Sequence, residues 1–172
     1  MLVIRPSGYR ACERPQLRLG PERGKMWNVP VARYRGTTRY VKIVISGRVQ
    51  PGKNDASHWL GKFNGPYSKK TGMAIFPGSL NLGLNQNFDW FAPIYSPKIV
   101  WFGKNEYGGE RDILLLPCTL TNLANRRAFL WTTTTAARDQ LAPSVVEIIT
   151  DVELRKVYGL MDGSIVDVEL DL

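Results

Sequence analysis

The chain has 172 residues, of which 44% are apolar and 10% aromatic, and its formal net charge is +8. This length fits one compact domain, and the sequence lacks the uncharged apolar run of about 18 residues that a membrane span needs. The start, MLVIRPSGYR, is too weakly apolar for a secretory signal. We therefore expect a cytoplasmic protein without membrane association, compatible with a monomer, with free thiols at Cys12 and Cys118.

The excess positive charge is confined to the first 42 residues. This segment contains ten Lys or Arg residues and two Glu residues, whereas residues 43–172 contain 13 basic and 13 acidic residues. Four prolines and the lack of hydrophobic periodicity predict an irregular basic arm over 1–38, ahead of a folded domain over 39–172. The arm is either a segment that is solvated or wraps around the folded domain, or a nucleic-acid-binding segment, and the sequence leaves these alternatives open.

Beyond residue 38, short β-branched or apolar runs alternate with turn residues. Residues 39–49 alternate polar and apolar side chains and are followed by Pro51, which predicts a strand. Six further runs have the same character: 79–84, 98–102, 112–120, 128–135, 145–150 and 164–170. Seven short strands favour a mainly β fold, either a small barrel or a sandwich.

One short C-terminal helix is expected over residues 151–160. Asp151 can cap its N-terminus, and Gly159 can supply the left-handed residue at its C-terminus. The following Asp162-Gly163 pair tolerates positive φ, so we expect a turn there into the last strand.

The chain offers few residues for catalysis. Its single histidine, His58, excludes a two-histidine metal site, and no G-x-S-x-G elbow or Cys-His nucleophile pair is evident. The carboxylates are dispersed, so no acid pair of the glycosidase kind can be named. Phosphoryl transfer remains open, because it depends on positioning and charge neutralisation more than on a strong nucleophile.

The stretch GMAIFPGSLNLGL at 72–84 carries two neutral oxygen ligands after a Pro-Gly turn. In an extended segment Ser79 and Asn81 share one side, while Leu80 points to the other. Mg²⁺ prefers hard oxygen ligands and keeps several waters, so one hydroxyl and one amide carbonyl can hold it beside substrate phosphates. On chemistry alone, the stretch is either such a site or an ordinary turn.

Three stretches resemble the archaeal CTP-dependent riboflavin kinase family. They are GRVQPGKNDASHWL at 47–60, GMAIFPGSLNLGL at 72–84 and VVEIITDVELRKVYGLMDGSIVDVEL at 145–170, in the family's order and spacing. The resemblance covers about residues 41–172 and leaves the arm outside. It implies a cradle-loop β-barrel that transfers the γ-phosphoryl group of CTP to the 5′-hydroxyl of riboflavin, which gives FMN.

The resemblance also implies roles for single residues. It assigns magnesium to Ser79 and Asn81, and flavin contacts to Thr135 and Glu147, of which Glu147 is also the candidate catalytic residue. Its nucleotide-contacting positions are Gly52, Lys53, Asn54, Asp55, Ala56, Ser57, Val152, Glu153, Leu154 and Arg155. A helix that starts near Val152 would offer N–H groups to phosphate, and Arg155 could add a bidentate contact.

The chain departs from the family pattern at several positions. Asn54 and Ala56 stand where the family tends to have glycine, and residues 135–139 lack a family histidine. The methyl group of Ala56 could crowd a close phosphate. Two alternatives therefore stay open beside the kinase: a catalytically inactive flavin- or nucleotide-binding relative, and a nucleic-acid-binding protein that acts through its arm.

Overall fold

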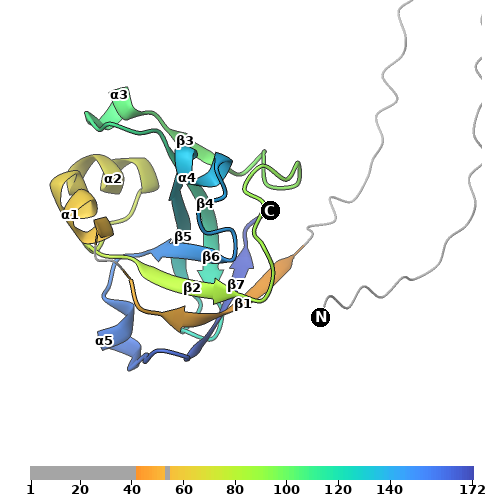
Figure 1. Cartoon of the computed structure of the whole chain (residues 1–172). Coiled ribbons are helices and arrows are strands. Elements are labelled where there is room, and N and C mark those ends of the chain that lie inside the picture. The colour runs from red at the N-terminus through yellow and green to blue at the C-terminus, as the bar shows by residue number, and fades with distance from the viewer. Residues whose placement is uncertain (1–41, 53–54) are drawn as a thin grey trace, which may run out of the picture. The chain divides into compact units, whose positions relative to one another are not determined.

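The computed structural model describes residues 42–52 and 55–172, which form an antiparallel β-barrel with short helices around it (Figure 1). The strands are β1 (Ile43–Gln50), β2 (Leu80–Leu84), β3 (Val100–Phe102), β4 (Ile113–Leu120), β5 (Arg126–Thr133), β6 (Val145–Ile149) and β7 (Ile165–Leu170). The helices are α1 (Asp55–Lys62), α2 (Asn64–Thr71), α3 (Lys104–Tyr107), α4 (Thr134–Arg138) and α5 (Leu154–Tyr158).

Six strands close the barrel in the order β4-β5-β6-β2-β1-β7, and β7 pairs back with β4. All pairings between the described strands are antiparallel. β5 pairs with β4 along its whole length, whereas β3 pairs with residues 113–115 of β4 and β7 with residues 118–120. β3 is therefore an extra strand outside the closed ring.

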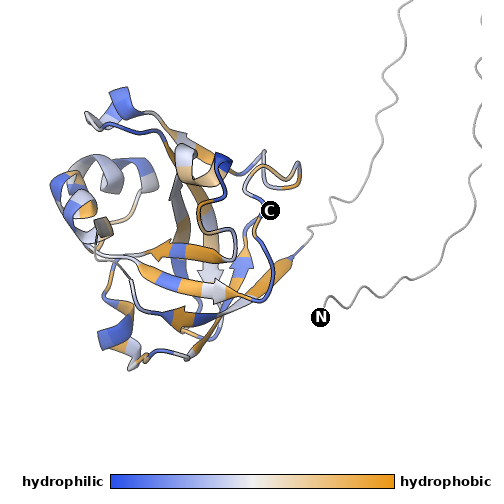
Figure 2. Ribbon diagram, in the orientation of Figure 1, coloured by the Kyte–Doolittle hydropathy of each residue, from blue (hydrophilic) through white to orange (hydrophobic). Residues whose placement is uncertain are grey.

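The strands pack apolar side chains on both faces of the barrel wall. Every second residue points inward, and the largest buried set comprises Leu80, Leu82, Leu114, Leu116, Leu120, Leu130, Val146, Ile148, Val166, Val168 and Leu170. A second cluster packs the outer face of the wall against α1 and α2 and contains Leu60, Tyr67, Ile75, Phe102, Ile113, Leu115, Phe129, Trp131 and Ile149. Burying each Leu or Ile side chain is worth about 1.5–3 kcal/mol. In Figure 2 the hydrophobic residues accordingly concentrate on the strands.

The mainly β barrel expected from the sequence is confirmed, and each expected strand is present. β1 begins at Ile43, and residues 39–41 of the expected first strand lie outside the described part of the chain. β5 ends at Thr133, two residues before its expected end. The reason is that the Thr133 hydroxyl accepts a 3.1 Å hydrogen bond from the Ala136 amide and caps α4.

The expected C-terminal helix is present but shorter, and its N-cap was predicted wrongly. α5 begins at Leu154, and its N-cap is Glu153, which makes no capping hydrogen bond through its side chain. The Asp151 carboxylate instead accepts hydrogen bonds from Arg126 at 2.7 Å and from the Thr150 hydroxyl at 3.0 Å. Gly159 ends the helix with φ +62°, as predicted, and Gly163 takes φ +85° in the predicted turn before β7.

The sequence did not predict the α1 and α2 helices. α2 contains Gly65 and Pro66 and has little helix propensity of its own. Burial stabilises both helices, because Leu60 of α1 and Tyr67 of α2 are at most 1% exposed in the outer cluster.

Several expectations concern residues that the structure does not describe: the basic arm, with Cys12, and the loop residues Lys53 and Asn54. Within the described part of the chain, Cys118 is buried and its thiol is free. None of the helices in that part is long and apolar enough to cross a membrane.

Candidate active site

A pocket of about 740 Å³ lies against β2, β5 and β6. Its volume is typical of sites that take small molecules. Residues of five other segments complete its wall: the end of β1 with the start of α1, the 76–79 turn, Phe88 with Trp90, the 136–143 segment and the 150–155 segment.

Four residues that line this pocket form a row across adjacent strands, which we call the cross-strand row: Gln50, Asn81, Glu147 and Trp131. The register pairs Gln50 of β1 with Asn81 of β2. Glu147 of β6 then pairs with Asn81 on one side and with Trp131 of β5 on the other. Directly opposite residues of antiparallel strands point to the same face, with Cβ atoms about 4.5–5.5 Å apart.

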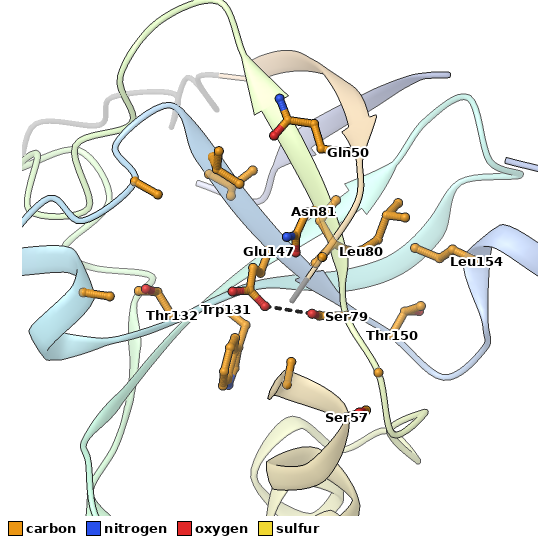
Figure 3. A pocket seen from close by; sticks show the side chains of 18 of the residues that line it. Gln50, Ser57, Ser79, Leu80, Asn81, Trp131, Thr132, Glu147, Thr150 and Leu154 are labelled. Atoms are coloured by element: carbon orange, nitrogen blue, oxygen red, sulfur yellow. Dashed lines mark hydrogen bonds between the residues drawn. The ribbon is translucent and has the colours of Figure 1, made fainter. Parts of the chain in front are cut away.

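The Ser79 hydroxyl donates a 2.7 Å hydrogen bond to Oε2 of Glu147, next to Asn81 (Figure 3). Since this bond uses the hydroxyl proton, the lone pairs of the Ser79 oxygen can face a cation or a polar ligand. Leu80, between the two polar residues, is 4% exposed and packs in the barrel interior. The predicted alternation, with Ser79 and Asn81 on one side and Leu80 on the other, therefore holds.

The turn before Ser79 is fixed by two backbone hydrogen bonds. The Phe76 amide donates to the Thr150 carbonyl at 2.8 Å, and the Gly78 amide donates to the Phe76 carbonyl at 2.8 Å. A Cβ at Gly78 would lie 2.7 Å from the Phe76 ring, so a larger residue would displace that ring. The turn thus ties Ser79 to the residue that follows β6, the strand that carries Glu147.

The oxygen atoms at this point suit a hard divalent cation. Ser79 offers a hydroxyl, Asn81 an amide carbonyl and Glu147 a carboxylate, and all three residues line the pocket. Mg²⁺ takes oxygen ligands and is usually held by one or two protein groups plus substrate phosphates and waters. The described residues contain no cluster of three or more His, Cys, Asp or Glu side chains that could hold a metal by themselves. A magnesium ion at this point would therefore take its remaining ligands from substrate phosphates and water.

Seven of the ten predicted nucleotide-contacting residues line this pocket. Its lining includes Gly52, Ala56, Ser57, Val152, Glu153, Leu154 and Arg155. The resemblance places residues 52–57 in a nucleotide loop, but Asp55, Ala56 and Ser57 are the first three residues of α1. His58, on the same helix, is exposed and contacts the Trp59 ring, outside the pocket lining.

Two details of the predicted phosphate contacts differ in the structure. α5 begins two residues after Val152 and has only five residues, so it presents a weaker helix dipole than expected. Arg155 lines the pocket, but its Nη2 donates to Asp162 at 2.6 Å and to the Gln50 carbonyl at 2.8 Å. These bonds connect the end of β1 with the turn that follows α5.

Thr135, the second expected flavin contact, is exposed on α4 and is absent from the pocket lining. It was expected at the end of a strand, but the chain turns into α4 after Thr133 and carries this side chain elsewhere. Thr132, Ala136 and Ala137 line the pocket in this region.

Sequence reasoning also missed Trp131, which forms part of the pocket wall. Its indole N–H donates a 3.1 Å hydrogen bond to the hydroxyl of Tyr67 on α2, and both side chains are buried. Burial raises the pKa of the Tyr67 hydroxyl, although the bond from Trp131 opposes this shift. The available signal was the alternation of β5, which places Trp131 on the face opposite to Leu130.

Comparison with known families agrees with this geometry. A family model for CTP-dependent riboflavin kinases, whose description reads domain of unknown function DUF120, matches residues 49–170. The match includes the whole cross-strand row and Ser79. A search among curated proteins finds no match. The chain belongs to the CTP-dependent riboflavin kinase family.

Proposed function

We propose that this protein transfers the γ-phosphoryl group of CTP to the 5′-hydroxyl of riboflavin, which yields FMN and CDP. Family membership supports the reaction class. The observation that carries the proposal is the hydrogen bond from Ser79 to Glu147, with Asn81 paired to Glu147 across the strands. Phosphoryl transfer needs this kind of site, with oxygen ligands for a cation at a point where two substrates can meet.

Ser79 and Asn81 would hold Mg²⁺ through the hydroxyl and the amide carbonyl. A bound magnesium ion would neutralise charge on the β- and γ-phosphates. The segments at 52–57 and 152–155, which line the same pocket, would position the nucleotide beside these two residues.

Glu147 has two tasks in this proposal. Its Oε2 accepts the hydrogen bond from the Ser79 hydroxyl and so leaves the lone pairs of that oxygen for the cation. An ionised carboxylate has about four acceptor positions, so Glu147 can also accept a hydrogen bond from the 5′-hydroxyl and orient it for in-line attack. A loose transition state demands little of a general base, so orientation is the main contribution of Glu147.

An inactive flavin- or nucleotide-binding relative is the second candidate. Ala56, which replaces a typical family glycine, lies in the pocket lining at the start of α1, and Thr135 lies outside that lining. Both observations concern substrate contacts rather than the oxygen ligands. A protein of this kind would gain thermal stability from its ligand without forming product.

The test is an assay of the purified full chain with riboflavin, CTP and Mg²⁺, with FMN detected by chromatography. We expect FMN, and we expect none when Mg²⁺ is removed with EDTA. Parallel reactions with ATP, GTP and UTP identify the phosphoryl donor. No FMN with any of the four nucleotides would refute the kinase, and a ligand-induced rise in Tm without product would favour the inactive relative.

Nucleic-acid binding through the basic arm is tested separately, since residues 1–38 lie outside the described part of the chain. Binding that falls steeply with salt and disappears on deletion of residues 1–38 would support it. Binding that survives the deletion would exclude the arm as its cause.

A further inference from the structure

Gln50 stands at the β1 end of the cross-strand row, and neither the family resemblance nor the proposed chemistry gives it a role. Its side chain is exposed and lines the pocket. Its backbone carbonyl accepts the 2.8 Å hydrogen bond from Arg155, which holds the end of β1 in place. The backbone is therefore anchored, and the residue forms part of the pocket wall.

Gly83 determines where this carboxamide lies. Gly83 follows Asn81 by two residues, so both positions are on the same face of β2. A Cβ at Gly83 would lie only 2.6 Å from the carboxamide carbon of Gln50 and 3.3 Å from its Cγ. The Gln50 side chain thus fills the space above Gly83 and points away from Ser79 (Figure 3).

The part of the pocket on this side of Asn81 is largely apolar. Gly83 pairs with Val145, and beyond it the Phe88 amide donates to the Pro143 carbonyl at 2.7 Å. Val145, Phe88 and Pro143 all line the pocket. Gln50 and Gln140 are the carboxamides among these apolar groups. A carboxamide in such a place can orient a mostly apolar ligand, since it offers two donors and an acceptor.

We propose that Gln50 is a specificity-determining residue that hydrogen-bonds the polar edge of the riboflavin ring system. This inference rests on the proposed function. This edge alternates carbonyl and N–H groups, which a carboxamide can match with both of its functions. Gln50 and Glu147 lie two strand spacings apart, or about 10 Å. The ribityl chain of riboflavin bridges a gap of this order, with its 5′-hydroxyl at Glu147 and its ring beside Gln50.

The experiment compares the wild-type full chain with Gln50→Leu, which keeps the size of the side chain and removes its hydrogen-bonding groups. We expect the KM for riboflavin to rise about tenfold, as expected for loss of one buried hydrogen bond. The KM for CTP and kcat should change less than about twofold, since the proposed contact is made to riboflavin alone.

A second variant, Gly83→Ala, displaces the carboxamide without changing Gln50. It should raise the KM for riboflavin as well, and the double variant should show little more than the larger single effect, because both changes remove one interaction. Gln86→Leu is the matched control: Gln86 is exposed and absent from the pocket lining, so its KM values should equal those of the wild type. Thermal melting of each variant verifies that it is folded.

The outcomes separate this inference from the proposed function. If the wild type forms FMN and Gln50→Leu leaves the KM for riboflavin unchanged, the role of Gln50 is wrong and the kinase stands. A rise in the KM for CTP alone would place Gln50 at the cytosine base and overturn the flavin contact. If the wild type forms no FMN, the proposed kinase activity is wrong, and a riboflavin fluorescence titration tests the Gln50 contact instead. Weaker riboflavin binding by Gln50→Leu than by the wild type supports the contact. Equal binding by both proteins, or no binding by the wild type, overturns it.

Discussion

Asn81 and Ser79 each offer the candidate site one side-chain oxygen, so single substitutions can test them. Both lie on the pocket side of the chain, while the neighbouring Leu80 secures the segment in the barrel interior. Changes at these two positions can therefore alter chemistry with little effect on packing.

If Asn81 is the proposed Mg²⁺ ligand, Asn81→Ala should lower Mg²⁺-dependent kcat by about 100-fold or more, because losing a metal ligand removes several kcal/mol of transition-state stabilisation. Its Tm should stay close to that of the wild type, since Asn81 is only half-buried. Initial rates over a Mg²⁺ titration measure the effect. Asn85→Ala, an exposed amide just after β2, is the matched control. Unchanged kinetics for Asn81→Ala would show that residues 72–84 form an ordinary turn without a metal ligand at Asn81.

At Ser79, one variant that removes the hydroxyl can be compared with another that keeps it. Ser79→Ala removes both the donor to Glu147 and the proposed metal ligand, so kcat should fall by about 100-fold. Ser79→Thr keeps the hydroxyl and should retain activity within about fivefold of the wild type. The same Mg²⁺-dependent rates provide the measurement. Equal losses in both variants would show that packing, and not the hydroxyl, matters at this position.

The residues of the site were predictable to different degrees. Ser79 and Asn81 were singled out by their chemistry and strand alternation, and Glu147 by the family resemblance, and neither argument needs knowledge of strand pairing. Gln50 and Trp131 were not, because they join the site through their register with Asn81 and Glu147. A single sequence does not reveal that register.

At the scale of elements, α2 is connected to the pocket wall through one buried hydrogen bond, from Trp131 to Tyr67. Tyr67→Phe leaves the indole N–H buried without this partner and should lower the free energy of unfolding by about 1–2 kcal/mol. Urea denaturation measures the loss. In a double-mutant cycle with Trp131→Phe, the two effects should be coupled by about 1 kcal/mol. Additive effects would show that the bond contributes nothing to stability.

The turn between β6 and α5 should respond to acid. Desolvation of Asp151 opposes the shift, but hydrogen bonds from Arg126 and Thr150 lower the pKa of its carboxyl below the ordinary value. A lowered pKa in the folded state stabilises the fold above the unfolded pKa of about 4, and this contribution disappears as pH falls through the folded value.

Asp151→Asn should therefore be less stable than the wild type by a constant amount above about pH 5, and this difference should shrink below about pH 4. Urea denaturation of both proteins between pH 3 and pH 7 gives the comparison. A difference that does not depend on pH would show that the charge of Asp151 has no part in holding the turn.

Elements also differ in how far the sequence determines them. The strands follow from local alternation, so each was found within a few residues. α1 and α2 form because Leu60 and Tyr67 reach a cluster on the outer face of the barrel, a tertiary effect that no local pattern expresses. The N-cap of α5 was assigned wrongly for a similar reason: Asp151 is bonded to Arg126, which is 25 residues away in the sequence.

At the scale of the whole molecule, the excess positive charge and the family match lie in different parts of the chain. Residues 43–172 have no net charge, and the family match at 49–170 lies entirely within them. Attraction of phosphorylated substrates therefore has to come from local groups in the pocket, among them the proposed magnesium ligands, and not from a broadly basic surface.

The most direct test is the rate of FMN formation by the full chain from riboflavin and CTP, with Mg²⁺ and then with EDTA. The proposed site predicts steady FMN formation that requires Mg²⁺ and is lost in Asn81→Ala. Absence of FMN with CTP and every other nucleoside triphosphate, from a protein that is folded by thermal melting, would contradict it.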